Sequence, residues 1–187
     1  MGNYIYEDNL QSERLLTRKL NESDILIWEE FFEDSEAVEF LYLSSLGLSS
    51  NIEYATHMIN KQLERYKDKR FGHQALFDTK TKNFIGICGL LTQEIDEKKE
   101  IEVGYHILKK FWGQGYATEA AKLFIDYAFK NELANSIVSV IDVENFKSQK
   151  VAKKNGLTIE KKTKWLDNED VYIYRIFKEN LKKKHSA

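Results

Sequence analysis

The segment from residue 100 to 129 constrains the fold most, because a strand, a glycine-containing loop and a helix follow one another there directly. Between residues 101 and 107, apolar residues alternate with Glu102, Gly104 and His106, which predicts a strand with two different faces. From residue 117 to 129, apolar residues recur at helical spacing. The order strand, loop, helix suits a cradle for a phosphate.

A candidate anion site lies where this loop enters the helix. The first turn of a helix has unpaired N–H groups and the positive end of the helix dipole, so it can hold an anion without a cationic side chain. Glycine permits positive φ and a close approach of the ligand. The candidate residues are Gly113, Gln114, Gly115, Tyr116, Ala117 and Thr118.

The 187 residues and their 42% hydrophobic content predict one folded domain over residues 1–187. A net charge of -2 predicts neither a nucleic-acid partner nor a membrane-surface partner. No apolar run approaches the roughly 20 residues that span a bilayer, and the N-terminus lacks a leader pattern, so we expect a cytoplasmic protein. The basic run at residues 182–185 is expected to be a solvated tail.

The cysteine and aromatic residues indicate a core and no metal site. Cys88 is the only cysteine, which excludes an intramolecular disulfide and a cysteine-rich zinc site. Since the four histidines also lack ligand spacing, we expect no metal. Cys88 should be a buried hydrophobe, and Trp28, Phe31 and Phe32 should belong to the core.

Short turns at residues 78–83 and 96–100 predict that three consecutive strands pair antiparallel. The helix after the central strand predicts a crossover to a parallel strand. Helical patterns at residues 24–32, 35–41 and from 51 onward, with a loop at 43–50, could form a lid or substrate wall. The expected strands are residues 13–20, 72–77, 84–92, 101–107, 136–140, 158–165 and 171–177.

These residues together resemble the GNAT acetyltransferases, which use acetyl-CoA. The family's pyrophosphate loop has the form Arg/Gln-x-x-Gly-x-Gly/Ala, and this chain has both glycines with Lys110 at the first position. The string EVGYHILKKFWGQGYATEAA, with Asn145-x-x-Ser148 downstream, is similar to the ribosomal-protein N-acetyltransferase (RimJ/RimL-type) branch. The resemblance implies an α/β (α+β) fold with a mixed, mostly antiparallel sheet of about seven strands, flanked by helices and splayed at a central cleft.

Other phosphate loops fit the same residues less well. A dinucleotide-binding fingerprint needs glycine or alanine where this chain has Thr118, and it would not follow two or three antiparallel strands. A Walker A loop needs Gly-Lys-Ser/Thr, which the chain lacks.

The resemblance also implies roles for particular residues. Acetyl-CoA would lie along the backbone of residues 106–108, that is His106, Ile107 and Leu108. Glu102 would be the general base, directly or through water, although it could equally be a salt-bridged strand residue. His106 fits a wall residue better than a base.

Two residues of the next helix have implied roles as well. Many relatives have a tyrosine as the thiolate's acid at the position of Ala152. The Rim branch instead points to the serine of Asn-x-x-Ser, so the resemblance implies that Ser148 hydrogen-bonds or protonates the CoA sulphur, unless it is an ordinary helix-start residue. Asn145 would bind the CoA arm or cap its helix.

The expected function is N-acetylation of a primary amine, most of all a protein or peptide N-terminal α-amine. An α-amine has a pKa near ~7.7 to 8.0, whereas a lysine side chain has one near ~10.4. A single carboxylate base could therefore suffice to deprotonate an α-amine at neutral pH. The alternatives are a small-molecule amine (polyamine, aminoglycoside or amino acid) and a non-catalytic acyl-CoA-binding module. Relatives suggest a possible homodimer. Acidic residues could favour a cationic acceptor if they face the cleft, and otherwise form a solvated helix face: Glu29, Glu30, Glu33, Asp34 and Glu36.

Overall fold

A computed structural model describes residues 7–180, so the basic run at 182–185 lies outside the described residues. Seven strands form one sheet in the order β1-β2-β3-β4-β5-β7-β6. The β4–β5 pair is parallel, and every other neighbouring pair of this sheet is antiparallel. The expected fold class is therefore confirmed. The strands are β1 (Leu15–Lys19), β2 (His73–Asp78), β3 (Phe84–Ile95), β4 (Lys98–Ile107), β5 (Ser136–Asp142), β6 (Thr158–Lys164) and β7 (Asp170–Phe177).

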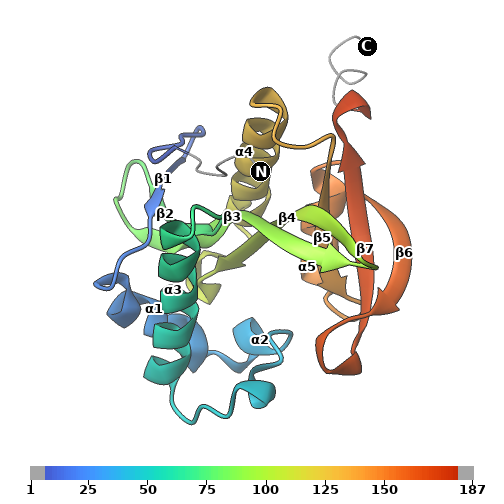
Figure 1. Ribbon diagram of the computed structural model, residues 1–187. Helices are drawn as coiled ribbons and strands as arrows, with labels where there is room; N and C mark the ends of the chain where they lie inside the picture. The colour runs from blue at the N-terminus through green and yellow to red at the C-terminus, as the bar shows by residue number, and fades with distance from the viewer. Residues whose placement is uncertain (1–6, 181–187) are drawn as a thin grey trace.

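Helices cover both faces of the sheet. Figure 1 shows α1 and α3 on the side of β1 and β2, away from the C-terminal strands β6 and β7, with α2 nearer the middle of the molecule. Short 3₁₀ segments occur at Leu43–Leu46, Lys109–Phe111 and Leu166–Asn168, the first of them inside the expected loop. The helices are α1 (Asp24–Glu33), α2 (Ser35–Val38), α3 (Asn51–Lys67), α4 (Tyr116–Lys130) and α5 (Phe146–Lys154).

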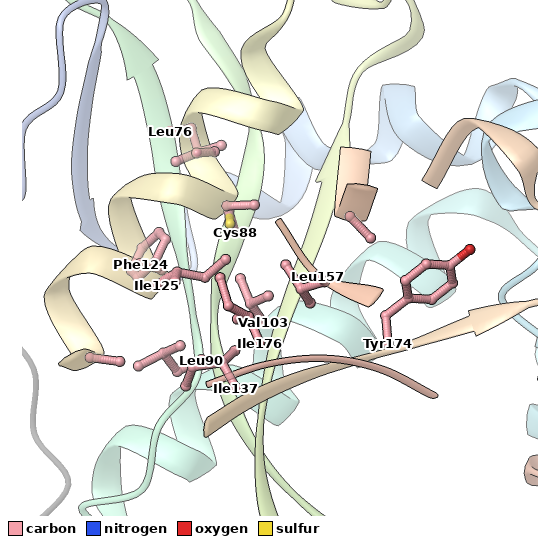
Figure 2. Close-up of a cluster of buried hydrophobic side chains, with 14 of the residues drawn as sticks. Leu76, Cys88, Leu90, Val103, Phe124, Ile125, Ile137, Leu157, Tyr174 and Ile176 are labelled. Atoms are coloured by element: carbon pink, nitrogen blue, oxygen red, sulfur yellow. The ribbon is translucent and has the colours of Figure 1, made fainter. Parts of the chain in front are cut away.

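Apolar clusters on both faces of the sheet hold these layers together. Figure 2 shows the cluster between the sheet and α4, where Phe124 and Ile125 of the helix lie near Leu90 of the sheet. Cys88 belongs to this cluster and is fully buried, as expected. On the opposite face, α1 and α3 pack against the sheet through a second cluster that includes Trp28. The predicted core residues Trp28, Phe31 and Phe32 are all buried there.

The β3–β4 hairpin is tighter than the sequence suggested. The expected turn spanned residues 96–100, but the two strands run from Phe84–Ile95 into Lys98–Ile107. Asp96 and Glu97 alone connect them, with φ of 48° and 62°. Two consecutive residues with positive φ match the right-handed twist of a hairpin, so the charged residues that follow can continue the ladder.

The start of α3 illustrates how the sequence sets a helix boundary. Ser50 accepts a hydrogen bond from the Glu53 backbone, and the Glu53 carboxylate accepts one from the Ser50 backbone. This capping box satisfies two amides that would otherwise lack partners.

Within residues 7–180, no helix combines the length and apolarity needed to cross a membrane.

Candidate active site

The sheet opens between β4 and β5. β4 is paired with β3 from Lys98 to Ile107, whereas it pairs with β5 at one position, Glu102 opposite Val138. Side-chain hydrogen bonds also link the two strands here, among them the one from the Ser139 hydroxyl to the Val103 carbonyl at 3.2 Å. The two parallel strands separate beyond these residues, which produces the splay expected from the sequence.

Glu102 lies where the two strands part. Its side chain points to the α1–α3 face, because Ile101 and Val103 on either side pack toward α4. The Glu102 carboxylate accepts from the Val140 backbone nitrogen at 3.1 Å and from Gln93 Nε2 at 2.7 Å. The residue is 7% exposed, and burial raises the pKa of its carboxyl against the opposing effect of these two hydrogen bonds. A buried carboxylate with a raised pKa is suited to act as a general base.

An ion pair closes the other end of the gap. The Arg175 guanidinium on β7 donates to the Glu100 carboxylate at 2.9 and 3.0 Å and to the Ser136 hydroxyl at 2.7 Å. Glu100 lies two residues before Glu102 on β4, and Ser136 is the first residue of β5. The pair therefore links β4 to β7 and to the start of β5, on the N-terminal side of the position where β4 and β5 separate.

The loop before α4 has the geometry of an anion site. Gly113 and Gly115 have φ of 75° and 85°, a region that L residues with side chains seldom adopt. No described side chain caps the 15-residue helix that begins after Gly115. The first amides of α4, from Tyr116 to Thr118, are therefore not used by a cap, and the exposed loop fits a group such as a diphosphate.

The side chains of the loop differ in where they point. Tyr116 is turned inward, and its hydroxyl donates to Asp78 Oδ2 at 2.8 Å. Gln114 is exposed and donates through Nε2 to the Lys110 carbonyl at 3.1 Å. Ala117 and Thr118 are partly buried in the first turn of α4. Tyr116 can therefore contribute only backbone groups to a ligand in the loop.

Sequence reasoning missed Arg14 beside this loop. Its Nη1 donates to the Gln114 carbonyl at 3.0 Å, while Nε and Nη2 lie 2.7 Å from Glu119 Oε2 on α4. The guanidinium carbon lies 4.5 Å from the centre of the Tyr116 ring. The sequence pattern offered no reason to place Arg14 at the loop, and the structure brings it there from a position 100 residues away. Glu119 in the first turn of α4 was the available signal for such a partner.

The three predicted cofactor residues at the end of β4 and just beyond are packed into both faces of the sheet. His106 shares the face of Glu102, and its ring centroid lies 5.8 Å from that of Phe31. Ile107 and Leu108 are buried in opposite clusters. Two of their backbone groups already have partners, since Trp112 Nε1 donates to the Ile107 carbonyl at 2.7 Å and the Leu108 amide donates to the Ile85 carbonyl at 3.0 Å.

The first turn of α5 lies across the splay from β4. The Asn145 side chain caps this helix, because its Oδ1 accepts a hydrogen bond from the Ser148 amide at 3.0 Å. The Tyr105 hydroxyl donates to the Ser148 carbonyl at 3.0 Å, and burial raises the pKa of Tyr105. The capping role weighed for Asn145 is thus observed, and Ser148 lies part-buried near the gap.

The acidic residues of α1 and α2 do not form an open negative wall. Asp34 and Glu36 lie within 2.9 Å of Lys109 Nζ, and Glu30 lies 2.6 Å from Lys110 Nζ. Glu36 also contacts Lys147 of α5. These ion pairs join the first helices to the segment before the glycine loop and to α5. The expected solvated helix face is therefore observed only in part, because lysines pair with Glu30, Asp34 and Glu36 and offset their negative charge.

Other ionisable groups near β4 are buried without forming a metal cluster. Burial lowers the pKa of His106 to about 4 and raises the pKa of the Cys88 thiol well above its ordinary value. Within residues 7–180, no group of three or more histidine, cysteine, aspartate or glutamate side chains is arranged to hold a metal ion.

A seven-stranded mixed sheet that splits at its parallel pair, beside a glycine loop opening a helix, is the architecture implied by the resemblance to the GNAT acetyltransferases. Residues 14–158 match the family model described as acetyltransferase (GNAT) domain. The chain therefore belongs to the GNAT acetyltransferase family.

Individual relatives agree with this assignment. The chain is 28% identical over 179 residues to an uncharacterized N-acetyltransferase p20 of Bacillus licheniformis, covering 91% of this chain and 97% of that protein. It is 36% identical over 98 residues to the uncharacterized protein YkkB of Bacillus subtilis, which covers 52% of this chain but only 56% of that relative. RimL, a ribosomal L7/L12 α-N-protein acetyltransferase solved with coenzyme A, has the same fold, with a TM-score of 0.72, 18% identity and coverage of 91% and 98% of the two chains.

Proposed function

We propose that this chain is an acetyl-CoA-dependent N-acetyltransferase whose preferred acceptor is the N-terminal α-amine of a protein or peptide. The observation that carries the proposal is the buried Glu102 carboxylate at the branch point of β4 and β5, on the same strand that leads into the glycine loop. When bound, acetyl-CoA would supply the acetyl thioester.

The amides of Tyr116, Ala117 and Thr118, with Gly113 to Gly115, would hold the diphosphate of the cosubstrate. The backbone of residues 106–108 would flank the pantetheine arm where its groups are not already paired. Asn145 and Ser148 would bind near the sulphur, with the Ser148 hydroxyl as a hydrogen-bond donor. Binding at both ends of the strand–loop–helix segment would place the thioester in the splay.

Glu102 would accept the proton that the acceptor ammonium loses, directly or through a water molecule. Its raised pKa makes it a stronger base than an ordinary glutamate. An α-amine, with a pKa near ~7.7 to 8.0, needs less help from such a base than a lysine near ~10.4.

The choice of acceptor has support from two sides. RimL, a structural neighbour that shares the fold of this chain at 18% identity, is an α-N-protein acetyltransferase. The lysines that pair with Glu30, Asp34 and Glu36 reduce the negative charge that a polyamine would require. We therefore place a small-molecule amine second, and we propose a cytoplasmic location and a single catalytic domain.

The test is competition among three acceptors at neutral pH: a peptide with a free N-terminus and an internal lysine, the same peptide N-blocked, and spermidine. Released CoA thiol gives the rate, and mass spectrometry locates the acetyl group. We expect acetylation at the α-amine of the first peptide. Acetylation confined to spermidine, or to the lysine of the blocked peptide, would refute the acceptor assignment. Binding of acetyl-CoA without turnover of any amine would instead favour a non-catalytic acyl-CoA-binding module.

A further inference from the structure

His73, the first residue of β2, is a buried polar side chain with no assigned role. It is 3% exposed, and neither Nδ1 nor Nε2 has a hydrogen-bond partner among the described residues. A neutral imidazole has one N–H donor and one acceptor nitrogen, and leaving such groups unpaired in a protein interior costs stability. Buried polar groups without partners are rare enough to require an explanation, and a bound ligand is one.

The backbone of His73 is held from both sides by α3. Gln62 Oε1 accepts a hydrogen bond from the His73 amide at 2.9 Å, and the Tyr66 hydroxyl donates to the His73 carbonyl. Gln62 is itself buried. Two polar side chains of α3 therefore fix the backbone from which the His73 side chain extends, while its two buried ring nitrogens have no hydrogen-bond partner among the described residues.

Glycines let the His73 ring reach β4. In the sheet, His73 lies opposite Gly89, and Gly89 lies opposite Gly104 on β4. A Cβ atom added to Gly104 would lie 2.7 Å from His73 Nε2, so the imidazole occupies the space that a side chain of residue 104 would fill. This explains why residue 104 is a glycine in a strand.

The ring thus joins the row of side chains on the Glu102 face of β4. Glu102 is two residues before Gly104 and His106 two residues after it, and alternation puts both on this face. The ring centroids of His73 and His106 are 5.3 Å apart. Gly104 and His106 are partly exposed, so the buried His73 ring lies next to positions of β4 that solvent reaches.

We propose that His73 binds the acceptor amine and orients it for attack. Nε2 of the neutral imidazole accepts a hydrogen bond from one N–H of the neutral amine. Glu102, or a water molecule bound to it, accepts a hydrogen bond from the other N–H. With its N–H groups held by two acceptors on one face of β4, the amine directs its lone pair across the gap toward β5. His73 forms no covalent bond, and Glu102 takes the proton that the acceptor ammonium loses to become this neutral amine. This inference rests on the proposed function and adds an acceptor-binding residue to it.

The surroundings of His73 keep its imidazole suited to this role. Burial lowers the pKa of His73 well below its ordinary value, with smaller contributions from His106, Arg65 and Lys61. The ring therefore stays neutral at physiological pH, and one nitrogen keeps the lone pair that a hydrogen-bond acceptor needs.

The test compares His73→Phe, which keeps a ring without nitrogens, with His73→Gln, whose amide oxygen can approach the position of Nε2. His57→Phe, at an exposed position on α3, is the matched control. We expect His73→Phe to lower kcat/KM for the amine about tenfold, the scale of one lost hydrogen bond. The calorimetric Kd for CoA should stay within twofold of the wild-type value, and His73→Gln should recover part of the loss.

Two results would overturn the inference: a His73→Phe variant with kcat/KM for the amine within twofold of wild type, or one whose CoA affinity falls in parallel, which indicates a structural role. If the wild-type protein acetylates no amine, the proposed function fails separately. Imidazole ¹⁵N shifts of the wild-type protein, titrated with the free-amine peptide in the presence of CoA, then decide the matter. A shift of the His73 nitrogens supports acceptor binding, and unchanged signals refute it.

Discussion

The backbone N–H of Val140 on β5 donates to the Glu102 carboxylate on β4, with 3.1 Å between the nitrogen and Oε1. This bond crosses the gap just beyond the single paired position of the two strands. A side-chain oxygen therefore takes the place of the ladder partner that the splay removes. Glu102 is at once a structural link between the strands and the candidate base, and experiments must separate the two roles.

Glu102→Gln should separate them. The amide oxygen can still accept from Val140, so the free energy of unfolding should change little. As a base is lost, kcat should fall about 10²-fold or more, and the acidic limb of the pH profile of kcat/KM should disappear. Glu102→Ala, the control, should also lower the free energy of unfolding by about 1–3 kcal/mol, because it leaves the buried Val140 amide unpaired. A Glu102→Gln enzyme with the wild-type rate and pH profile would assign Glu102 to structure alone.

Gln93 should tune the pKa of Glu102. Its Nε2 donates to the carboxylate at 2.7 Å, and a hydrogen bond to the charged form lowers a carboxyl pKa. Gln93→Leu removes this effect, so the pKa of Glu102, already raised by burial, rises further. The carboxylate then loses its charge at a higher pH on acidification, and the acidic limb of kcat/KM should move to higher pH. A limb that stays in place or moves to lower pH would contradict the assignment of this limb to Glu102.

Gly115→Asp tests the position of the cosubstrate. The substitution adds a side chain at φ of 85° and a negative charge at the start of α4, and both oppose an anion there. Affinity for acetyl-CoA measured by calorimetry should fall at least about tenfold. Gly47→Asp is a matched control, since Gly47 also has positive φ, at 63°, and an added Cβ meets no atom within 4 Å. Undiminished affinity in a folded Gly115→Asp protein would show that the cosubstrate binds elsewhere.

Arg14→Gln tests whether the arginine near the loop supports cosubstrate binding. The variant loses the ion pair with Glu119 and the contact with the Gln114 carbonyl, so the loop should be held less firmly. We expect a KM for acetyl-CoA several-fold higher, with the KM for the amine nearly unchanged. Arg18→Gln is the comparison, because Arg18 pairs with Asp24 through two nitrogens at 2.7 Å, at the start of α1. Equal effects of both substitutions on KM for acetyl-CoA would argue for a general loss of structure.

Local sequence determined the segment from β4 to α4. Alternation over residues 101–107, two glycines and helical spacing after residue 117 each depend on neighbours within a few positions. The same short-range signals predicted the seven strands, the parallel crossover and the buried aromatic residues of α1. They were less reliable at the β3–β4 turn, where Asp96 and Glu97 adopt positive φ without a glycine. Tertiary pairing of the two strands decided that conformation over local preference.

Only the tertiary structure decided the partners within the site. Arg14 reaches the loop from 100 residues away, Val140 reaches Glu102 from 38, and the His73 ring lies over Gly104 from another strand. None of these contacts has a periodic signature, because each depends on strand order and on register. A shift of one residue in either strand pairing would turn the side chains of the shifted strand to the opposite face. The sequence alone could therefore indicate which residue types carry the chemistry, while the sheet determined which of them meet.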